Sequence, residues 1–349
     1  MPPVPGPDPL GMPIPVGYLF VLKVFGFFLH AVFMNLWLAG LPVAVILARS
    51  HPRVSDRLIA AMPFAMAFGI NAGIVPLLFL QTLYPQFFYP ATILQAWFWF
   101  LIIPLLLIAY TAVYAAAFGR WRILSSLVAV ILLTWIGFQF SAAMALTARP
   151  DRWPALFQNA APAGGVHGWT LALDPEALLR LGLMAGMAFG TVGAFLALLA
   201  ELSRDDSRLQ EQARPLVPIL FTIGLGIFGL AGSLYAPTVA DRLPQILQLL
   251  AGASMPIAWA AAWLYRAQPR PATAIVLTIL QGGVLLSNAI ARQVVQAAEL
   301  GQWVDLGKIP VRGEWGSVFL FLVTLLIGIA TLAWIFKTVW ARVREVRPG

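Results

Sequence analysis

Long apolar runs recur along the whole chain and constrain its fold more than any other feature. A helix needs about 20 apolar residues to cross the hydrocarbon core of a bilayer. Of the 349 residues, 60% are hydrophobic and only 10% are charged, against about 25% charged in a soluble domain. The sequence therefore predicts an all-α, polytopic membrane helical bundle with about nine transmembrane helices, at 17–48, 58–84, 91–118, 122–147, 176–201, 214–236, 243–265, 271–297 and 315–340.

These spans divide the chain into five parts. They are an outer N-terminal segment, a four-helix membrane bundle, an outer loop, a five-helix membrane bundle and a cytoplasmic tail, at residues 1–16, 17–147, 148–175, 176–340 and 341–349. The first segment is too rich in proline to be helical, and we expect it to cap the outer side. The loops 148–175 and 298–314 mix Trp with Gly and Pro, as interfacial segments do. They are either ordinary interfacial loops or a docking surface for a partner.

The positive charges predict the orientation, because Lys and Arg accumulate in cytoplasmic connections. With the N-terminus outside, fourteen lie inside: Arg49, Arg53, Arg57, Arg120, Arg122, Arg204, Arg208, Arg214, Arg266, Arg270, Lys337, Arg342, Arg344 and Arg347. Six lie outside: Arg149, Arg152, Arg180, Arg242, Lys308 and Arg312. We expect a multi-pass protein of a bacterial inner membrane, with the C-terminus in the cytoplasm. The net charge of +8 reflects this topology rather than binding to nucleic acid.

The residues that are missing also narrow the function. The chain has no cysteine, which excludes disulfides, thiolate metal sites and covalently attached haem. All 14 Asp and Glu residues lie outside the predicted spans or at their ends. A proton-coupled transporter needs carboxylates or histidines across the bilayer, so the pattern argues against one.

The most informative polar residue is His30, in the apolar stretch "GFFLHAVFMNLWLAG". Neutral imidazole is the common axial ligand of haem b, so His30 is a candidate haem-iron ligand; a hydrogen bond to a neighbouring helix is the alternative. Lys23 lies seven residues earlier on the same helix face. Its ammonium is either an interface anchor or the partner of a haem propionate.

A second polar group lies in the predicted span 271–297. Gln281, Asn288 and Arg292 are spaced by seven and four residues, so they share one helix face. Arg292 either extends to the interface or holds a propionate or a quinone carbonyl. Gln281 and Asn288, with Gln81 from the second span, are candidates for a quinone pocket, and Asn71 is a further candidate cofactor contact.

Glycine spacing predicts where two spans approach closely. Gly182, Gly186 and Gly190 recur every four residues, and Gly224, Gly226, Gly229 and Gly232 lie in the following span. Small residues at this spacing let membrane helices pack backbone to backbone.

The stretch "FAMAFGINAGIVPLLFLQTLYPQFFY", residues 64–89, resembles the second helix of cytochrome bd-type quinol oxidase subunit I, which has a similar F-G-I-N phrase and an aromatic outer connection. The resemblance implies nine helices with the N-terminus outside, a haem-ligating histidine at His30, and a methionine haem ligand at Met255 in "AGASMPIAW". It is best over residues 17–120.

The chain departs from this family where oxygen chemistry is concerned. The stretch "LGLMAGMAFG" has no second haem-binding histidine, "LQAWFWFLIIPLLLIAY" lacks the family's acidic residues, and "APTVADRLP" is short where the family has its quinol-binding loop. At most one haem b is therefore expected, and oxygen reduction is not.

These observations favour a membrane-integral subunit of a respiratory electron-transfer complex, in contact with membrane lipid. It would act as a quinol-oxidising oxidoreductase subunit, not an oxidase by itself, and pass electrons to a separate periplasmic c-type cytochrome or other redox subunit. A haem-free scaffold for periplasmic electron carriers and a small-solute transporter, using Asn71, Gln81, Gln139 and Asn288 as a polar path, are the alternatives.

Overall fold

The chain folds into a bundle of long helices. A computed structural model describes residues 4–119, 121–160, 174–313 and 315–345. Its helices are α1 (Val16–Leu47), α2 (Pro52–Leu83), α3 (Pro85–Gln95), α4 (Trp97–Phe100), α5 (Ile102–Ala117), α6 (Arg122–Ala148), η1 (Pro150–Arg152), α7 (Trp153–Ala160), α8 (Pro175–Leu202), α9 (Ser207–Tyr235), η4 (Ala236–Val239), α10 (Gln245–Ala267), α11 (Pro271–Gly301), η5 (Leu306–Lys308) and α12 (Trp315–Glu345).

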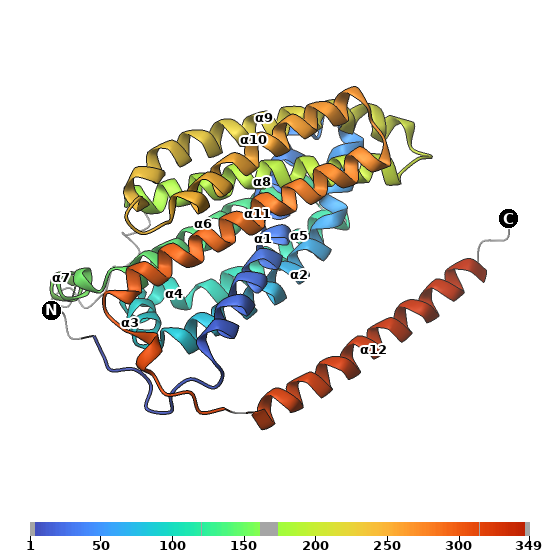
Figure 1. Ribbon diagram of the computed structural model, residues 1–349. Coiled ribbons are helices and arrows are strands. Elements are labelled where there is room, and N and C mark those ends of the chain that lie inside the picture. Colours follow the sequence, from blue (N-terminus) through green and yellow to red (C-terminus); the bar gives the residue numbers. More distant parts are fainter. Residues whose placement is uncertain (1–3, 120, 161–173, 314, 346–349) are drawn as a thin grey trace.

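The predicted all-helical fold is confirmed, and within the described residues eight helices are long and apolar enough to cross a membrane. The ninth predicted span falls on α12, whose side chains are described only in part. Figure 1 shows α12 apart from the other helices. Apolar side chains along it are exposed, among them Phe319, Leu326 and Trp334. The predicted cytoplasmic tail lies partly on α12, and residues 346–349 and the loop residues 161–173 lie outside the described part.

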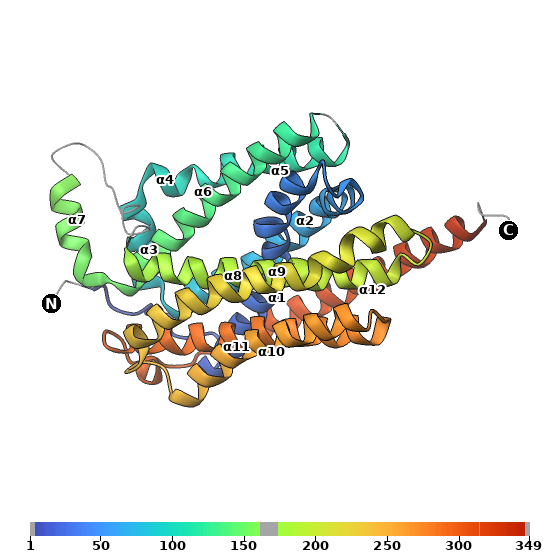
Figure 2. The same cartoon turned by 90° about the horizontal axis from the view of Figure 1, so that it is seen from above.

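Two groups of four helices form the bundle, and α1 lies between them. The first group contains α1, α2, α5 and α6, and the second contains α8, α9, α10 and α11 (Figures 1 and 2). Helix α1 packs against α2 and α6 of its own group and against α8 and α11 of the other. A side chain on α1 can therefore face either group, which makes this helix the place where residues from distant parts of the sequence meet.

The third predicted span was wrong at its start. Residues 91–95 belong to the short helix α3, and the apolar span runs from Trp97 to Ala117. Between the two, Ala96 has φ 49° and ψ −123°, a conformation that L-residues rarely adopt. The chain changes direction at this strained residue. The preceding residue, Gln95, is buried, and its Nε2 donates a hydrogen bond to the Gln139 backbone oxygen at 2.8 Å.

We expect Ala96→Gly to stabilise the protein. Glycine adopts positive φ without steric cost, and such strain costs about 1–3 kcal/mol at a non-glycine residue. The melting temperature in detergent should rise by a few degrees. Ala109→Gly is the matched control, because Ala109 is a buried residue inside α5, where glycine lowers stability by about 1 kcal/mol. Equal losses in both variants would contradict the strain at Ala96.

The proline-rich N-terminal segment is ordered by a pairing with the connection before α12. The Met12 N–H donates to the Pro310 oxygen at 2.9 Å, and the Arg312 N–H donates to the Met12 oxygen at 2.8 Å. Gly11 has φ 77° and lies against Pro310, so a side chain would not fit there. Figures 1 and 2 place this pairing at the same end as α3 and α7. We call this the N-terminal end of the bundle.

The opposite end of the bundle carries the turns rich in arginine. The Asp206 carboxylate caps α9 by accepting from the Leu209 N–H at 3.1 Å, and this hydrogen bond lowers the pKa of Asp206. Asp206 also pairs with Arg57 at 3.4 Å. The Arg53 N–H donates to the Gln212 side chain at 3.0 Å, so the start of α2 is joined to α9. These contacts bring the predicted cytoplasmic connections together.

The predicted close approach of glycine-rich helices is confirmed between α8 and α9. A Cβ built on Gly186 would lie 2.7 Å from the Gly224 oxygen, and one on Gly224 would lie 2.6 Å from the Gly186 oxygen. The two backbones therefore touch at this crossing. Gly226 and Gly229 of α9 have nothing within 4 Å and do not take part.

Candidate functional site: a cationic groove between α1 and α11

Two cations from distant parts of the sequence lie together where α1 faces α11. Lys23 is 6% exposed, and its ammonium donates a hydrogen bond to the Gln296 side chain. The Lys23 nitrogen also lies 5.7 Å from the ring centre of Tyr84. Burial raises the pKa of Tyr84, so the ring is neutral and does not compensate the charge.

Arg292 supplies the second cation, one helical turn before Gln296. Its guanidinium carbon lies 4.1 Å from the centre of the Phe27 ring, a cation–π contact. The Arg292 side chain is exposed on the outside of the bundle. In the described part of the chain, neither Arg292 nor Lys23 pairs with a carboxylate. Lys23 is the buried one of the two, and its hydrogen-bond partner Gln296 is uncharged. A buried charge without an opposite charge is costly, so this grouping points to an anionic or electron-rich ligand.

His30 continues the same face of α1, with its ring centre 6.4 Å from that of Phe27. Its Nδ1 lies 2.8 Å from the Gly69 oxygen of α2. The predicted hydrogen bond to a neighbouring helix is thus present. Because a carbonyl oxygen can only accept, Nδ1 carries the proton, and the neutral ring keeps its lone pair on Nε2. The ring lies against Gly73, where a Cβ would be 2.7 Å from Nδ1.

We call the set Lys23, Phe27, His30, Arg292, Gln293 and Gln296 the α1–α11 groove. A cavity of about 10 Å³ lies beside Phe27, on the side of the ring away from the His30 end of the set, and it is lined by Lys23, Val24, Phe27, Ala289, Arg292, Gln293 and Gln296. This is about the space of one water molecule. The cavity itself is too small for a larger ligand, and Arg292 is the exposed side chain of its lining.

The structure separates the other candidate residues from the groove. Met255 is fully buried among α8, α9 and α10, where Cβ atoms on Gly190 and Gly224 would lie 3.1 and 2.9 Å from its methyl group. It therefore contacts a different set of residues from His30. Gln281 lies beside it, also buried, and donates to the Met187 oxygen and the Thr191 hydroxyl, both at 3.1 Å.

The Thr191 hydroxyl also accepts from Asn35 Nδ2 at 3.2 Å. Asn35 of α1, Thr191 of α8 and Gln281 of α11 thus join the two helix groups in the interior. Hydrogen-bonded polar side chains of this kind hold membrane helices together. We assign this cluster to packing.

Three polar candidates do not share a common site: Asn71, Gln81 and Asn288. Asn71 is exposed and donates to the Ala67 oxygen of its own helix at 2.8 Å. Asn288 donates to the Val284 oxygen of its own helix at 2.9 Å. Gln81 is half-buried near the end of α2. Asn71 and Asn288 therefore each hydrogen-bond within their own helix and not to each other.

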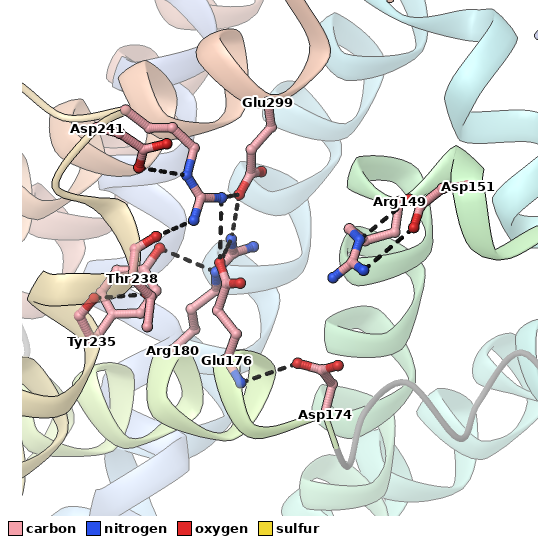
Figure 3. Close-up of polar contacts among 10 residues, drawn as sticks. Arg149, Asp151, Asp174, Glu176, Arg180, Tyr235, Thr238, Asp241 and Glu299 are labelled. Carbon is pink, nitrogen blue, oxygen red and sulfur yellow. Dashed lines mark hydrogen bonds and ion pairs between the residues drawn. The ribbon is translucent and has the colours of Figure 1, made fainter. Parts of the chain in front are cut away.

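Sequence reasoning missed an ionic cluster at the N-terminal end of the bundle (Figure 3). Arg180 of α8 lies 2.6 Å from Glu176 and 2.7 Å from Glu299, and its Nε donates to the Tyr235 hydroxyl at 3.1 Å. Arg242 adds a contact of 2.9 Å to Glu299. The four-residue spacing of Glu176 and Arg180 is typical of a helical ion pair, but nothing in the sequence indicates Glu299 as the shared partner. The cluster joins α8, α9 and α11.

No model of a known protein family matches the sequence, and no curated protein matches it.

Proposed function

We propose that the chain is the membrane-embedded subunit of a respiratory electron-transfer complex, and that its α1–α11 groove binds a quinol. The observation that supports this most is the meeting of Lys23, Arg292 and His30 on one lipid-facing groove. A quinone ring has two oxygens that accept hydrogen bonds and become more negative on deprotonation. Cationic donors suit such oxygens, and charge-assisted hydrogen bonds are about twice as strong as neutral ones.

The spacing of the groove residues matches a ring with a polar atom at each end. Lys23 and His30 are seven residues apart, which is about 10 Å along the helix. Phe27 lies between them, with its ring centre 6.4 Å from that of His30. The Arg292 guanidinium covers one face of the Phe27 ring at 4.1 Å, from where it can donate to a quinone oxygen.

The proposed reaction is the oxidation of quinol to quinone, which releases two electrons and two protons. The free Nε2 of His30 accepts the first proton, Lys23 and Arg292 stabilise the negative oxygen that forms, and the second proton leaves to water as the electrons depart. Both electrons pass, one at a time, to a separate c-type cytochrome on the side of the N-terminus. The proposal places the protein in a bacterial inner membrane with the N-terminus outside.

In a second candidate function, His30 would instead bind the iron of one haem b through Nε2, and it would then not be free to accept the quinol proton. Metal-ligating histidines usually donate their other ring nitrogen to a carbonyl or carboxylate, as Nδ1 does to Gly69 at 2.8 Å. Lys23 and Arg292 would then hold the propionates. Such a haem would supply one-electron transfer. Met255 lies in another cluster, so this proposal assigns it no part in binding the haem.

The quinol proposal is tested by titrating the purified chain in detergent with a short-tailed benzoquinone. We expect Lys23→Met and Arg292→Met each to weaken binding about tenfold, the effect of one charge-assisted hydrogen bond. Lys308→Met is the control, because Lys308 is 85% exposed and lies outside the groove. Unchanged affinity in both groove variants, or equal loss in the control, would rule out quinol binding there.

The haem proposal is tested by the visible spectrum of the same preparation. A reduced-minus-oxidised haem b signal should be present in the wild type and absent in His30→Ala. His51→Ala should keep it, since His51 contacts only Ser50 in a turn. A folded wild-type protein without this signal would contradict the haem proposal. It would not affect the quinol proposal, which the quinone titration tests separately.

A further inference from the structure

A cavity of about 410 Å³ lies at the opposite end of the bundle from the groove, beside the turn between α8 and α9. Its lining consists of Ser207, Gln210, Glu211, Arg214, Pro215 and Arg266. This volume is typical of a small-molecule site. The lining residues come from the first turns of α9 and the last turn of α10.

The charges of the lining are unevenly compensated. The Arg214 Nε donates to Glu201 at 3.0 Å, and Glu201 also accepts from the Tyr265 hydroxyl at 2.9 Å. Arg214 is therefore fixed and its charge is balanced. Among the described residues, Arg266 and Glu211 make no ion pair with any side chain. The cavity thus has one exposed cation, Arg266, and one exposed anion, Glu211, with which a ligand can pair.

The position of the cavity places it at the depth of lipid headgroups. Helix α10 ends at Ala267 and α9 begins at Ser207, so the cavity lies where two apolar spans end. Trp263 and Leu264, within one turn of Arg266, are 48% and 54% exposed. Tryptophan is enriched at the membrane–water interface, and these two side chains provide an apolar surface for an acyl chain next to the charged lining.

We propose that this cavity binds a zwitterionic headgroup that joins a phosphate to a primary ammonium, as in phosphatidylethanolamine. The phosphate pairs with Arg266, and the ammonium donates to Glu211. Basic pockets between membrane helices bind lipid phosphates in this way. Glu211 would repel a purely anionic headgroup. A choline headgroup has no N–H to donate to it.

The test is lipid selection by the purified full-length chain in nanodiscs of phosphatidylethanolamine, phosphatidylglycerol and phosphatidylcholine in equal amounts. After mild extraction, native mass spectrometry identifies the lipid that remains bound. The wild type should retain phosphatidylethanolamine. Arg266→Gln should lower its retention about fivefold, the effect of one arginine at a charged surface. Arg204→Gln is the control, because this exposed arginine lies in the same turn outside the cavity lining.

Glu211 provides the sharper variant. Glu211→Lys should reverse the preference towards phosphatidylglycerol, and unchanged melting temperatures would show that both variants fold. Soluble phosphoethanolamine that displaces the lipid at low concentration would assign the same site to a free headgroup instead of a lipid. A wild type that retains phosphatidylglycerol, or a preference unaffected by Arg266→Gln and Glu211→Lys, would overturn the proposal.

Discussion

Replacing Arg180 by methionine is expected to lower the free energy of unfolding by about 3 kcal/mol. The change removes the contacts to Glu176 and Glu299 and leaves a carboxylate that is only 8% exposed with Arg242 as its main partner. Breaking a buried ion pair from one side costs about 3–5 kcal/mol, because a charge stays buried without compensation. Reversible unfolding in mixed detergent micelles measures the loss.

Arg152→Met is the matched control for this variant. The Arg152 side chain is 52% exposed and lies 3.7 Å from Asp151, and exposed pairs contribute about 0–1 kcal/mol. The double variant Arg180→Met, Glu299→Gln should recover part of the stability, since the second change removes the buried carboxylate that has lost one of its two arginine partners. If Arg180→Met unfolds like Arg152→Met, the cluster does not hold α8, α9 and α11 together.

The second large effect is expected at the crossing of α8 and α9. Gly224→Ala adds a Cβ that would lie 2.6 Å from the Gly186 backbone oxygen. A backbone atom cannot move aside as a flexible side chain does, so the two helices must separate. Forcing an extra methyl group into a packed interior costs about 1–3 kcal/mol. The loss is measured by the same micelle unfolding experiment.

Gly226 lies two residues after Gly224 on the same helix. Gly226→Ala provides the control, because nothing lies within 4 Å of a Cβ added at this position. Alanine also favours the helix over glycine, so this variant should be as stable as the wild type or slightly more so. A similar loss in both variants would mean that helix propensity decides the result and that the close crossing does not.

The helical fold could be predicted because a chain that is buried in lipid can adopt few types of secondary structure. Backbone polar groups must be satisfied within each span, and eight of the nine predicted spans correspond to apolar helices. The start of the third could not be predicted. Alanine at position 96 gives no signal for positive φ, and the short helix before it, α3, is held by tertiary packing of the buried Phe87 and Phe88, which single-helix patterns do not report.

The candidate site was predictable only within single helices. The seven-residue spacing placed Lys23 and His30 on one face of α1, and the structure agrees. The meeting of this face with Arg292 depends on how α1 packs against α11, and spacing along one helix contains no information about a neighbour 260 residues away. For the same reason the sequence could not show that Met255 and Gln281 lie together, or that Glu299 is shared by Arg180 and Arg242.

Photo-crosslinking tests the central claim, that the α1–α11 groove binds a quinol, most directly. A quinone carrying a photoreactive group on its ring is bound to the chain in nanodiscs, illuminated, and located by mass spectrometry of peptides. If the groove binds the quinol, adducts form within residues 23–30 of α1 and 289–296 of α11, and both excess unlabelled quinone and Arg292→Met suppress them. Two results would contradict quinol binding in the groove: adducts at other residues that excess unlabelled quinone suppresses, or adducts that it suppresses nowhere.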